Sequence, residues 1–110
     1  MDPSEGTLEV VEQPDGVFEV SGQLDLGTAS LFRNAIRTAV EPGARIVLDF
    51  RDVTFMDSSG LQALVTVASE VAPGGVTIRG VHGSPLTVLS LTGLLDIAGL
   101  HVEPLADAEG

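Results

Sequence analysis

The sequence predicts an α/β domain: a mixed, mostly parallel sheet of about five strands with helices packed on it. Two observations predict this class. Apolar runs typical of strands alternate with amphipathic stretches typical of helices, in the order β-β-α-β-α-β-α-β. A Gln-Pro-Asp-Gly turn at 13–16 joins the first two runs into a hairpin. The length of 110 residues suits a single domain over 1–110, with a core over about 7–105 and loose ends at 1–6 and 106–110.

The first third of the chain predicts two strands and a helix. The strands are expected at 7–13 and 17–22, with inward positions at Leu8, Val10, Phe18 and Val20. The helix is expected to begin after Thr28, whose hydroxyl can accept backbone N–H groups as an N-cap, and to stop at Pro42 and Gly43. Its apolar face comprises Leu31, Phe32, Ala35, Ile36, Ala39 and Val40.

The middle third predicts a buried strand and a second helix. Three successive apolar residues at the centre of 45–50 are typical of a strand covered on both faces, and a short connector follows it. The helix runs from near Ser58 to about Ala72, with an inner stripe of Leu61, Leu64, Val65, Ala68 and Val71. Ala63 and Val67 fall beside that stripe, so we expect one of them to be partly exposed on a binding face.

The last third predicts a strand, a helix and an edge strand. The strands are expected at 76–81 and 100–103. Between them, Ser84 as N-cap and Pro85 as first residue open a third helix that Gly93 ends. The residues expected to pack from it are Leu86, Leu89 and Leu91. The four phenylalanines at 18, 32, 50 and 55 lie at expected core positions.

Composition excludes several function classes. The chain has no cysteine and no lysine, which excludes disulfide scaffolds, thiolate metal sites, Walker-type phosphate loops and Schiff-base chemistry. His82 and His101 are far apart in sequence, so we expect neither a metal nor a cofactor. The net charge of −11 opposes binding to nucleic acid and to anionic membranes.

No targeting or membrane segment is recognisable. The N-terminal residues are acidic and polar, unlike a signal peptide. The longest uncharged stretch, 80–95, is short and interrupted by glycine and proline, so we expect a cytoplasmic protein.

One segment has the residues for a specific chemistry. Asp-Ser-Ser-Gly at 57–60 opens the second helix directly after a strand and connector. The first N–H groups of a helix have no internal partners, and the helix dipole favours anions there. A serine at this point is either an N-cap or a hydroxyl placed to carry a phosphate.

Three segments resemble the STAS domains of bacterial anti-sigma factor antagonists. Phe-Met-Asp-Ser-Ser-Gly-Leu at 55–61 resembles the family's signature, Gly-Gln-Leu-Asp-Leu-Gly-Thr at 22–28 its loop after the second strand, and Leu-Ser-Leu-Thr-Gly-Leu at 89–94 a late motif. They occur in the family's order, and the resemblance covers about 7–105. The chain departs from the pattern at Gln23, where glutamate is usual, and in ending soon after its last strand.

The resemblance implies a phosphorylation switch without enzymatic activity of its own. Ser58 would be the phosphoacceptor, with Ser59 as the alternative acceptor or, more simply, the helix cap. The unmodified form would bind an anti-sigma factor serine kinase and so free a sigma factor, and a metal-dependent serine phosphatase would restore it. We expect a monomer or a weak dimer. The expected partner-binding residues are Asp25, Thr28, Asp57, Ser59, Gly60, Leu61, Ala63 and Val67.

Structural roles and other functions remain open at this stage. Asp25 could form an Asx-turn or support the cap at Thr28, and Asp57 could simply precede the helix. A second hypothesis is a non-phosphorylated STAS subunit of an ABC-type lipid transporter. A third is a small hydrolase, although Asp-Ser-Ser-Gly is not the Gly-x-Ser-x-Gly elbow of hydrolases. A phospho-aspartate receiver is excluded because its pattern needs a lysine.

Overall fold

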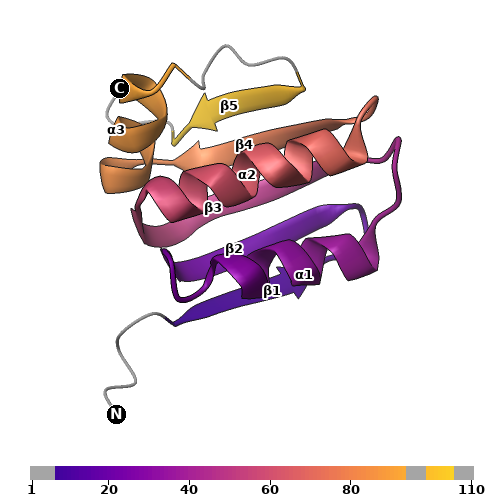
Figure 1. The fold of residues 1–110 in the computed structure, drawn as a ribbon, viewed down its shortest axis with the longest axis horizontal. Coiled ribbons are helices and arrows are strands. Elements are labelled where there is room, and N and C mark those ends of the chain that lie inside the picture. Colours follow the sequence, from indigo (N-terminus) through magenta and orange to yellow (C-terminus); the bar gives the residue numbers. More distant parts are fainter. Residues whose placement is uncertain (1–6, 94–98, 106–110) are drawn as a thin grey trace.

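A computed structural model describes residues 7–93 and 99–105, and within these ranges the predicted fold class and element order are confirmed (Figure 1). The expected loose ends, 1–6 and 106–110, lie outside the described residues. The elements are β1 (Leu8–Glu12), β2 (Val17–Leu24), α1 (Ala29–Ala39), β3 (Arg45–Met56), α2 (Ser58–Val71), β4 (Gly75–Val81), α3 (Gly83–Leu91) and β5 (Leu100–Pro104).

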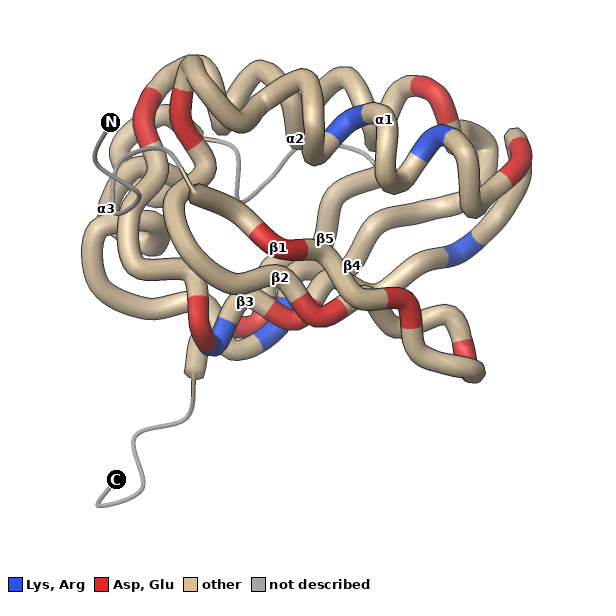
Figure 2. The backbone as a smooth tube through the Cα atoms, turned by 90° about the horizontal axis from the view of Figure 1, so that it is seen from below, with Lys and Arg blue, Asp and Glu red and all other residues tan. Residues whose placement is uncertain are grey.

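The five strands lie side by side in the order in which they occur along the chain. β1 runs antiparallel to β2, and the pairs β2–β3, β3–β4 and β4–β5 are parallel. Each parallel crossover therefore steps in the same direction, and crossovers of one hand then place their helices on the same face. Figure 2 shows α1 and α2 together on one side of the sheet.

Only one face of the sheet carries the core. In β3, Ile46, Leu48 and Phe50 are buried beneath the helices, whereas Val47 and Asp49 on the other face are half-buried. The expectation that 45–50 is covered on both faces is wrong. The local sequence resembles a doubly covered strand, but the unreversed strand order leaves no helix for the second face.

The hairpin is confirmed, and β3 is longer than expected. Gly16 adopts a φ of +81°, which glycine tolerates best, and the amide of Gln13 donates to the carbonyl of Val17 at 2.7 Å. The segment expected as a connector after residue 50 continues as strand to Met56. β3 stays paired with β2 as far as Met56, two residues before α2 begins.

Helix α1 begins where predicted but without the predicted cap. The buried Thr28 hydroxyl donates to the carbonyl of Gln23 at 2.7 Å and accepts from the amide of Asp25 at 2.9 Å, so it stabilises the preceding loop instead. Phe32 and Ile36 enter the core as expected, but Leu31 is 50% exposed.

Helix α2 has the predicted bounds but a different rotation about its axis. Its buried residues are Gly60, Ala63, Leu64, Val67, Ala68 and Val71. Ala63 and Val67 are 0% and 1% exposed, so the expectation of a partly exposed residue there is wrong. Val65, expected in the core, is 37% exposed instead. The buried set has helical spacing throughout, and its small members allow close packing against the sheet.

Helix α3 ends just before Gly93, as predicted, but differs from the prediction at its start. It begins at Gly83, with His82 rather than Ser84 in the N-cap position, and Pro85 is buried. Leu89 is fully buried, whereas Leu91 is 81% exposed. The final strand is confirmed as the edge strand β5.

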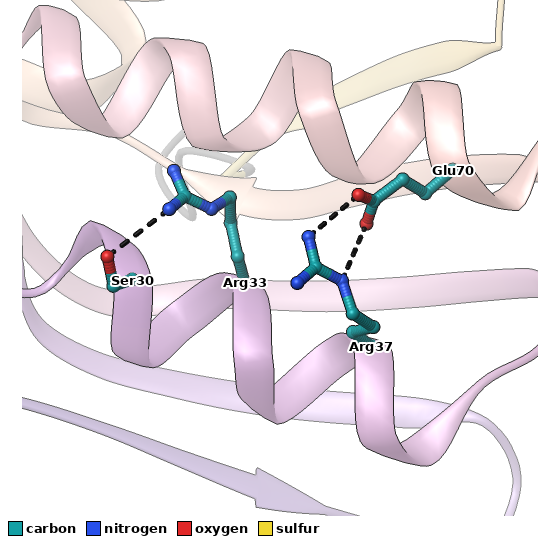
Figure 3. Close-up of polar contacts among 4 residues, drawn as sticks. All are labelled: Ser30, Arg33, Arg37 and Glu70. Carbon is teal, nitrogen blue, oxygen red and sulfur yellow. Dashed lines mark hydrogen bonds and ion pairs between the residues drawn. The ribbon is translucent and has the colours of Figure 1, made fainter.

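An ion pair joins α1 to α2 on the outer surface (Figure 3). The Arg37 guanidinium donates to both carboxylate oxygens of Glu70, at 2.8 and 3.4 Å. The hydrogen bond and charge of Glu70 raise the pKa of Arg37 above its ordinary value. One turn earlier, Arg33 donates to the hydroxyl of Ser30 at 3.2 Å.

Candidate functional site

The predicted site lies at the carboxyl ends of β2 and β3, on the left in Figure 1. Here β2 turns into the loop that precedes α1, and β3 turns into α2. The amide of Asp57 donates to the carbonyl of Leu24 at 3.3 Å, which ties the two turns together. The segments around Asp25 and Ser58, distant in sequence, therefore meet at one edge of the sheet, as predicted.

Asp57, not Ser59, caps helix α2. Its carboxylate oxygen Oδ1 accepts from the amides of Ser59 and Gly60 at 2.9 and 3.2 Å. The expectation of a Ser59 cap is wrong, because aspartate one position before the helix already occupies the first-turn amides. The structural alternative for Asp57 is thereby confirmed.

Ser58 is the first residue of α2, and its side chain is exposed. Among the described residues, no side-chain hydrogen bond engages its hydroxyl. Ser59, one position on, is half-buried. The division of roles follows from helix geometry, since successive residues point about 100° apart around the axis. Of the two serines, Ser58 is the more accessible nucleophile.

Gly60 is required by the close approach of α2 to β2. A Cβ atom at this position would clash with the carbonyl oxygen of Leu24, and would lie 2.7 Å from Cγ of Met56. Gly60 is therefore a packing residue, buried against the sheet.

The Asp25 side chain organises its own loop. Its Oδ1 accepts from the amides of Gly27 and Thr28 at 3.0 and 3.2 Å, which confirms the Asx-turn alternative. The Thr28 hydroxyl also lies 3.2 Å from Asp25 Oδ1. Asp25 and Thr28 thus shape the edge next to Ser58.

Exposed apolar side chains surround this edge. Phe55, expected in the core, is 42% exposed, and Leu26 in the neighbouring loop is 80% exposed. On α2, Leu61 and Val65 follow Ser58 at spacings of three and seven residues and so share its face. A hollow of about 360 Å³ adjoins them, lined by Leu61, Gln62, Val65, Thr66 and Thr92. We call Ser58, Leu61 and Val65, which share one face of α2, the Ser58 surface.

Sequence reasoning missed Phe55, Val65 and Leu26 as surface residues. For Phe55 the alternation along β3 gave no reliable signal, because two register irregularities interrupt it and the buried residues Phe50, Val53 and Met56 are spaced by three. For Val65 the signal was the regular spacing of small residues that places Ala63 and Val67 inside.

Within the described ranges, the histidines and the acidic residues form no cluster that could hold a metal ion. His82 Nε2 lies 2.8 Å from the carbonyl oxygen of Arg51, and His101 pairs with Glu103 at 3.3 Å. Both are exposed, as expected of ordinary surface residues. Within the same ranges, no helix combines the length and apolar character needed to cross a bilayer.

Comparison with known proteins places this geometry in a family. The model of the STAS domain matches residues 7–108. The chain belongs to the STAS domain family. This STAS domain is 28% identical over 86 residues to the anti-sigma-B factor antagonist of Bacillus subtilis, covering 76% of this chain and 79% of the relative.

Solved structures agree with the assignment. An anti-sigma factor antagonist from Mycobacterium paratuberculosis superposes with a TM-score of 0.72 at 28% identity, covering 88% of this STAS domain and 87% of that chain. The murine anion transporter solute carrier 26 family member A9 contains the same fold, with a TM-score of 0.65 at 22% identity. That match covers 86% of this chain but only 17% of the transporter, so it concerns the fold alone.

Proposed function

We propose that this STAS domain is an anti-sigma factor antagonist that acts by binding and has no catalytic activity of its own. Unmodified, it binds an anti-sigma factor serine kinase and so frees a sigma factor; phosphorylation of Ser58 ends the binding. The observation that carries the proposal is the exposed, unengaged hydroxyl of Ser58 on the same face of α2 as the half-buried Leu61 and the exposed Val65. The antagonists named among its relatives support the same function.

The modification transfers one phosphoryl group. The Ser58 oxygen forms a bond to the γ-phosphorus of ATP held by the kinase, the bond to the β–γ bridging oxygen breaks, and ADP leaves. The serine proton passes to a base of the kinase or to water. A metal-dependent serine phosphatase reverses the modification by hydrolysis, releasing inorganic phosphate.

The position of Asp57 favours an outward phosphate. The sequence alone suggested that free N–H groups at the helix start would accommodate the phosphate, but Asp57 already engages those of Ser59 and Gly60. A phosphate on Ser58, with about −1.5 to −2 charges, is also repelled by that carboxylate. It therefore faces the partner rather than folding back onto the helix.

An outward phosphate is enough to break the complex. The Ser58 surface is apolar, so a partner packed on it would desolvate the added charge. One unit charge about 6 Å from a like charge costs about 3 kcal/mol at an effective dielectric near 20. That energy corresponds to roughly a hundredfold weaker complex.

The test of the acceptor is phosphosite mapping by mass spectrometry after incubation with ATP and each candidate anti-sigma factor kinase of the same genome. Wild type and Ser59→Ala should each gain one phosphate, located on residue 58. Ser58→Ala should gain none and bind the kinase constitutively, and Ser58→Asp should bind poorly. Phosphate on Ser59 would overturn the acceptor assignment. An absence of both binding and phosphate on either serine with every kinase tested would favour the transporter-subunit alternative.

The test of the surface uses two arginine substitutions. Val65→Arg places a charge on the Ser58 surface and should weaken kinase binding at least about tenfold, as expected for a packed apolar contact. Ala39→Arg, at the exposed end of α1, adds the same charge elsewhere and should leave affinity unchanged. Isothermal titration calorimetry measures both. Equal affinities for the two variants would show that this face of α2 is not part of the interface. Val67→Arg is unsuitable here, because Val67 is 1% exposed and an arginine at this position would place an unpaired charge in the core.

A further inference from the structure

A hollow lies at the end of the sheet opposite Ser58, at the starts of β3, β4 and β5. It has a volume of about 440 Å³. The side chains of Arg45, Val47, Thr77 and His101 line it. These positions alternate with the buried residues Ile46, Val76 and Leu100, so they belong to the face of the sheet that no helix covers.

Two neighbouring glycines form the floor of this hollow. Gly75 is the register partner of Arg45, and Gly99 lies next to Gly75, because a Cβ atom added to Gly75 would lie 3.8 Å from the Gly99 carbonyl oxygen. Because neither residue has a side chain, the backbone at Gly75 and Gly99 is uncovered by a side chain of its own. Glycine within a sheet often marks a place where a ligand approaches the backbone closely.

Arg45 gives the hollow a charged wall. Within the described part of the chain, its guanidinium has neither an ion pair nor a side-chain hydrogen bond, whereas Arg37 and Arg79 are both paired with carboxylates. A free guanidinium binds a carboxylate through two parallel hydrogen bonds. The Thr77 hydroxyl is a further donor on the same wall, and Val47 adds an apolar contact.

We propose that this site, the Gly75 hollow, binds a small aromatic carboxylate. The ring lies on the backbone of Gly75 and Gly99, next to the row of Val47, Thr77 and His101, and the carboxylate lies on Arg45, the register partner of Gly75. The volume suits a single ring with one acidic group, since ligand sites usually range from about 300 to 1,000 Å³. The inference does not depend on the phosphorylation switch, which lies at the other end of the sheet.

The experiment is a titration of the isotope-labelled protein with benzoate, followed through backbone amide chemical shifts in buffer of about 0.15 M salt. Saturable shifts should centre on residues 45–47, 74–77 and 99–101, with millimolar affinity as expected for so small a ligand. Cyclohexanecarboxylate, which has the same charge but a puckered ring, and benzyl alcohol, which has the ring but no charge, should both bind at least about tenfold more weakly.

Three variants distinguish specific binding in the hollow from nonspecific electrostatic attraction of benzoate. Gly75→Val fills the hollow at a position where the Cβ meets no clash, so the fold should persist while benzoate binding is lost. Arg45→Gln should weaken binding about tenfold. Arg33→Gln removes the same charge from α1 and should bind as wild type does. The proposal is overturned by an absence of saturable shifts at the hollow, by unchanged binding to folded Gly75→Val, or by equal losses in the two arginine variants.

Discussion

In the segment 57–60, four neighbouring residues have three different structural roles. Asp57 caps the helix, Ser58 points to solvent, and Gly60 allows α2 to approach β2. The resemblance to a known motif predicted the importance of the segment but gave Ser59 the role that Asp57 has. The distinction depends on which side chain precedes the helix by one residue, and that boundary is hard to place from sequence.

The effect of Gly60→Ala on stability should have opposite signs at an exposed helix position and at a closely packed one. Alanine stabilises an exposed helix position by up to about 1 kcal/mol relative to glycine. Here the added methyl group meets the Leu24 carbonyl and Met56, so we expect a loss of about 1–3 kcal/mol in the free energy of unfolding by urea. Gln62→Ala, on the exposed side of the same helix, should change it by less than about 0.5 kcal/mol. A more stable Gly60→Ala variant would contradict the close approach.

At the scale of elements, sequence patterns predicted helix bounds better than helix rotation. The ends of α2 were clear from Asp-Ser-Ser-Gly and Pro-Gly-Gly, but its apolar residues cover more than half of its circumference. Of the predicted stripe, Leu61 is half-buried and packs against the core, but Val65 is exposed. The sheet instead accepts the stripe with the smallest residues, including Gly60 and Ala63, because close packing outweighs the size of any one side chain.

The rotation of α2 can be tested with two truncations. Leu64 is fully buried, so Leu64→Ala should lower the free energy of unfolding by about 2–5 kcal/mol through the cavity it leaves. Val65→Ala removes an exposed side chain on the next position and should cost less than about 1 kcal/mol. Urea denaturation followed by circular dichroism measures both. Similar losses in the two variants would contradict the rotation described.

Sheet coverage was not predictable from any single element. Each strand's hydrophobic run and each helix's amphipathic pattern are compatible with helices on one face or on both. The strand order decides between them, and it depends on pairings between segments far apart in the chain. In β3, helix coverage of only one face shows in the half-buried Val47 and the charged Asp49, which both lie on the uncovered face.

At the scale of the whole molecule, acidic residues outnumber arginines by 16 to 5 in the sequence, and those in the described ranges are spread over both layers (Figure 2). One row crosses the uncovered face through register partners: Glu19, Asp49, Arg79 and Glu103. Arg79 lies 3.7 Å from Asp49, whereas Glu19 and Asp49 are like charges on adjacent strands. Repulsion within the row and across the molecule opposes the compact state.

Salt should therefore stabilise the protein. Raising NaCl from about 0.02 to 0.5 M at pH 7 should raise Tm by a few degrees, because it screens exposed like charges. Glu19→Gln should add about 0.5 kcal/mol at low salt and nothing at high salt. Glu103→Gln, which removes the register partner of Arg79, should not stabilise at either salt concentration. A Tm that falls with salt in differential scanning calorimetry would contradict this account.

The strands lie in the sheet in the same order as along the chain, and this also affects how the protein folds during synthesis. A chain emerging from the ribosome adds each strand beside the one just completed, so no strand waits for a central partner that is synthesised later. Each crossover helix can cover its pair of strands before the next pair exists. In a fold whose strand order reverses, one edge of the first strand stays open until the second half is translated. Here the sheet grows outward from the β1–β2 hairpin, and only the newest edge is exposed at the growing side during synthesis.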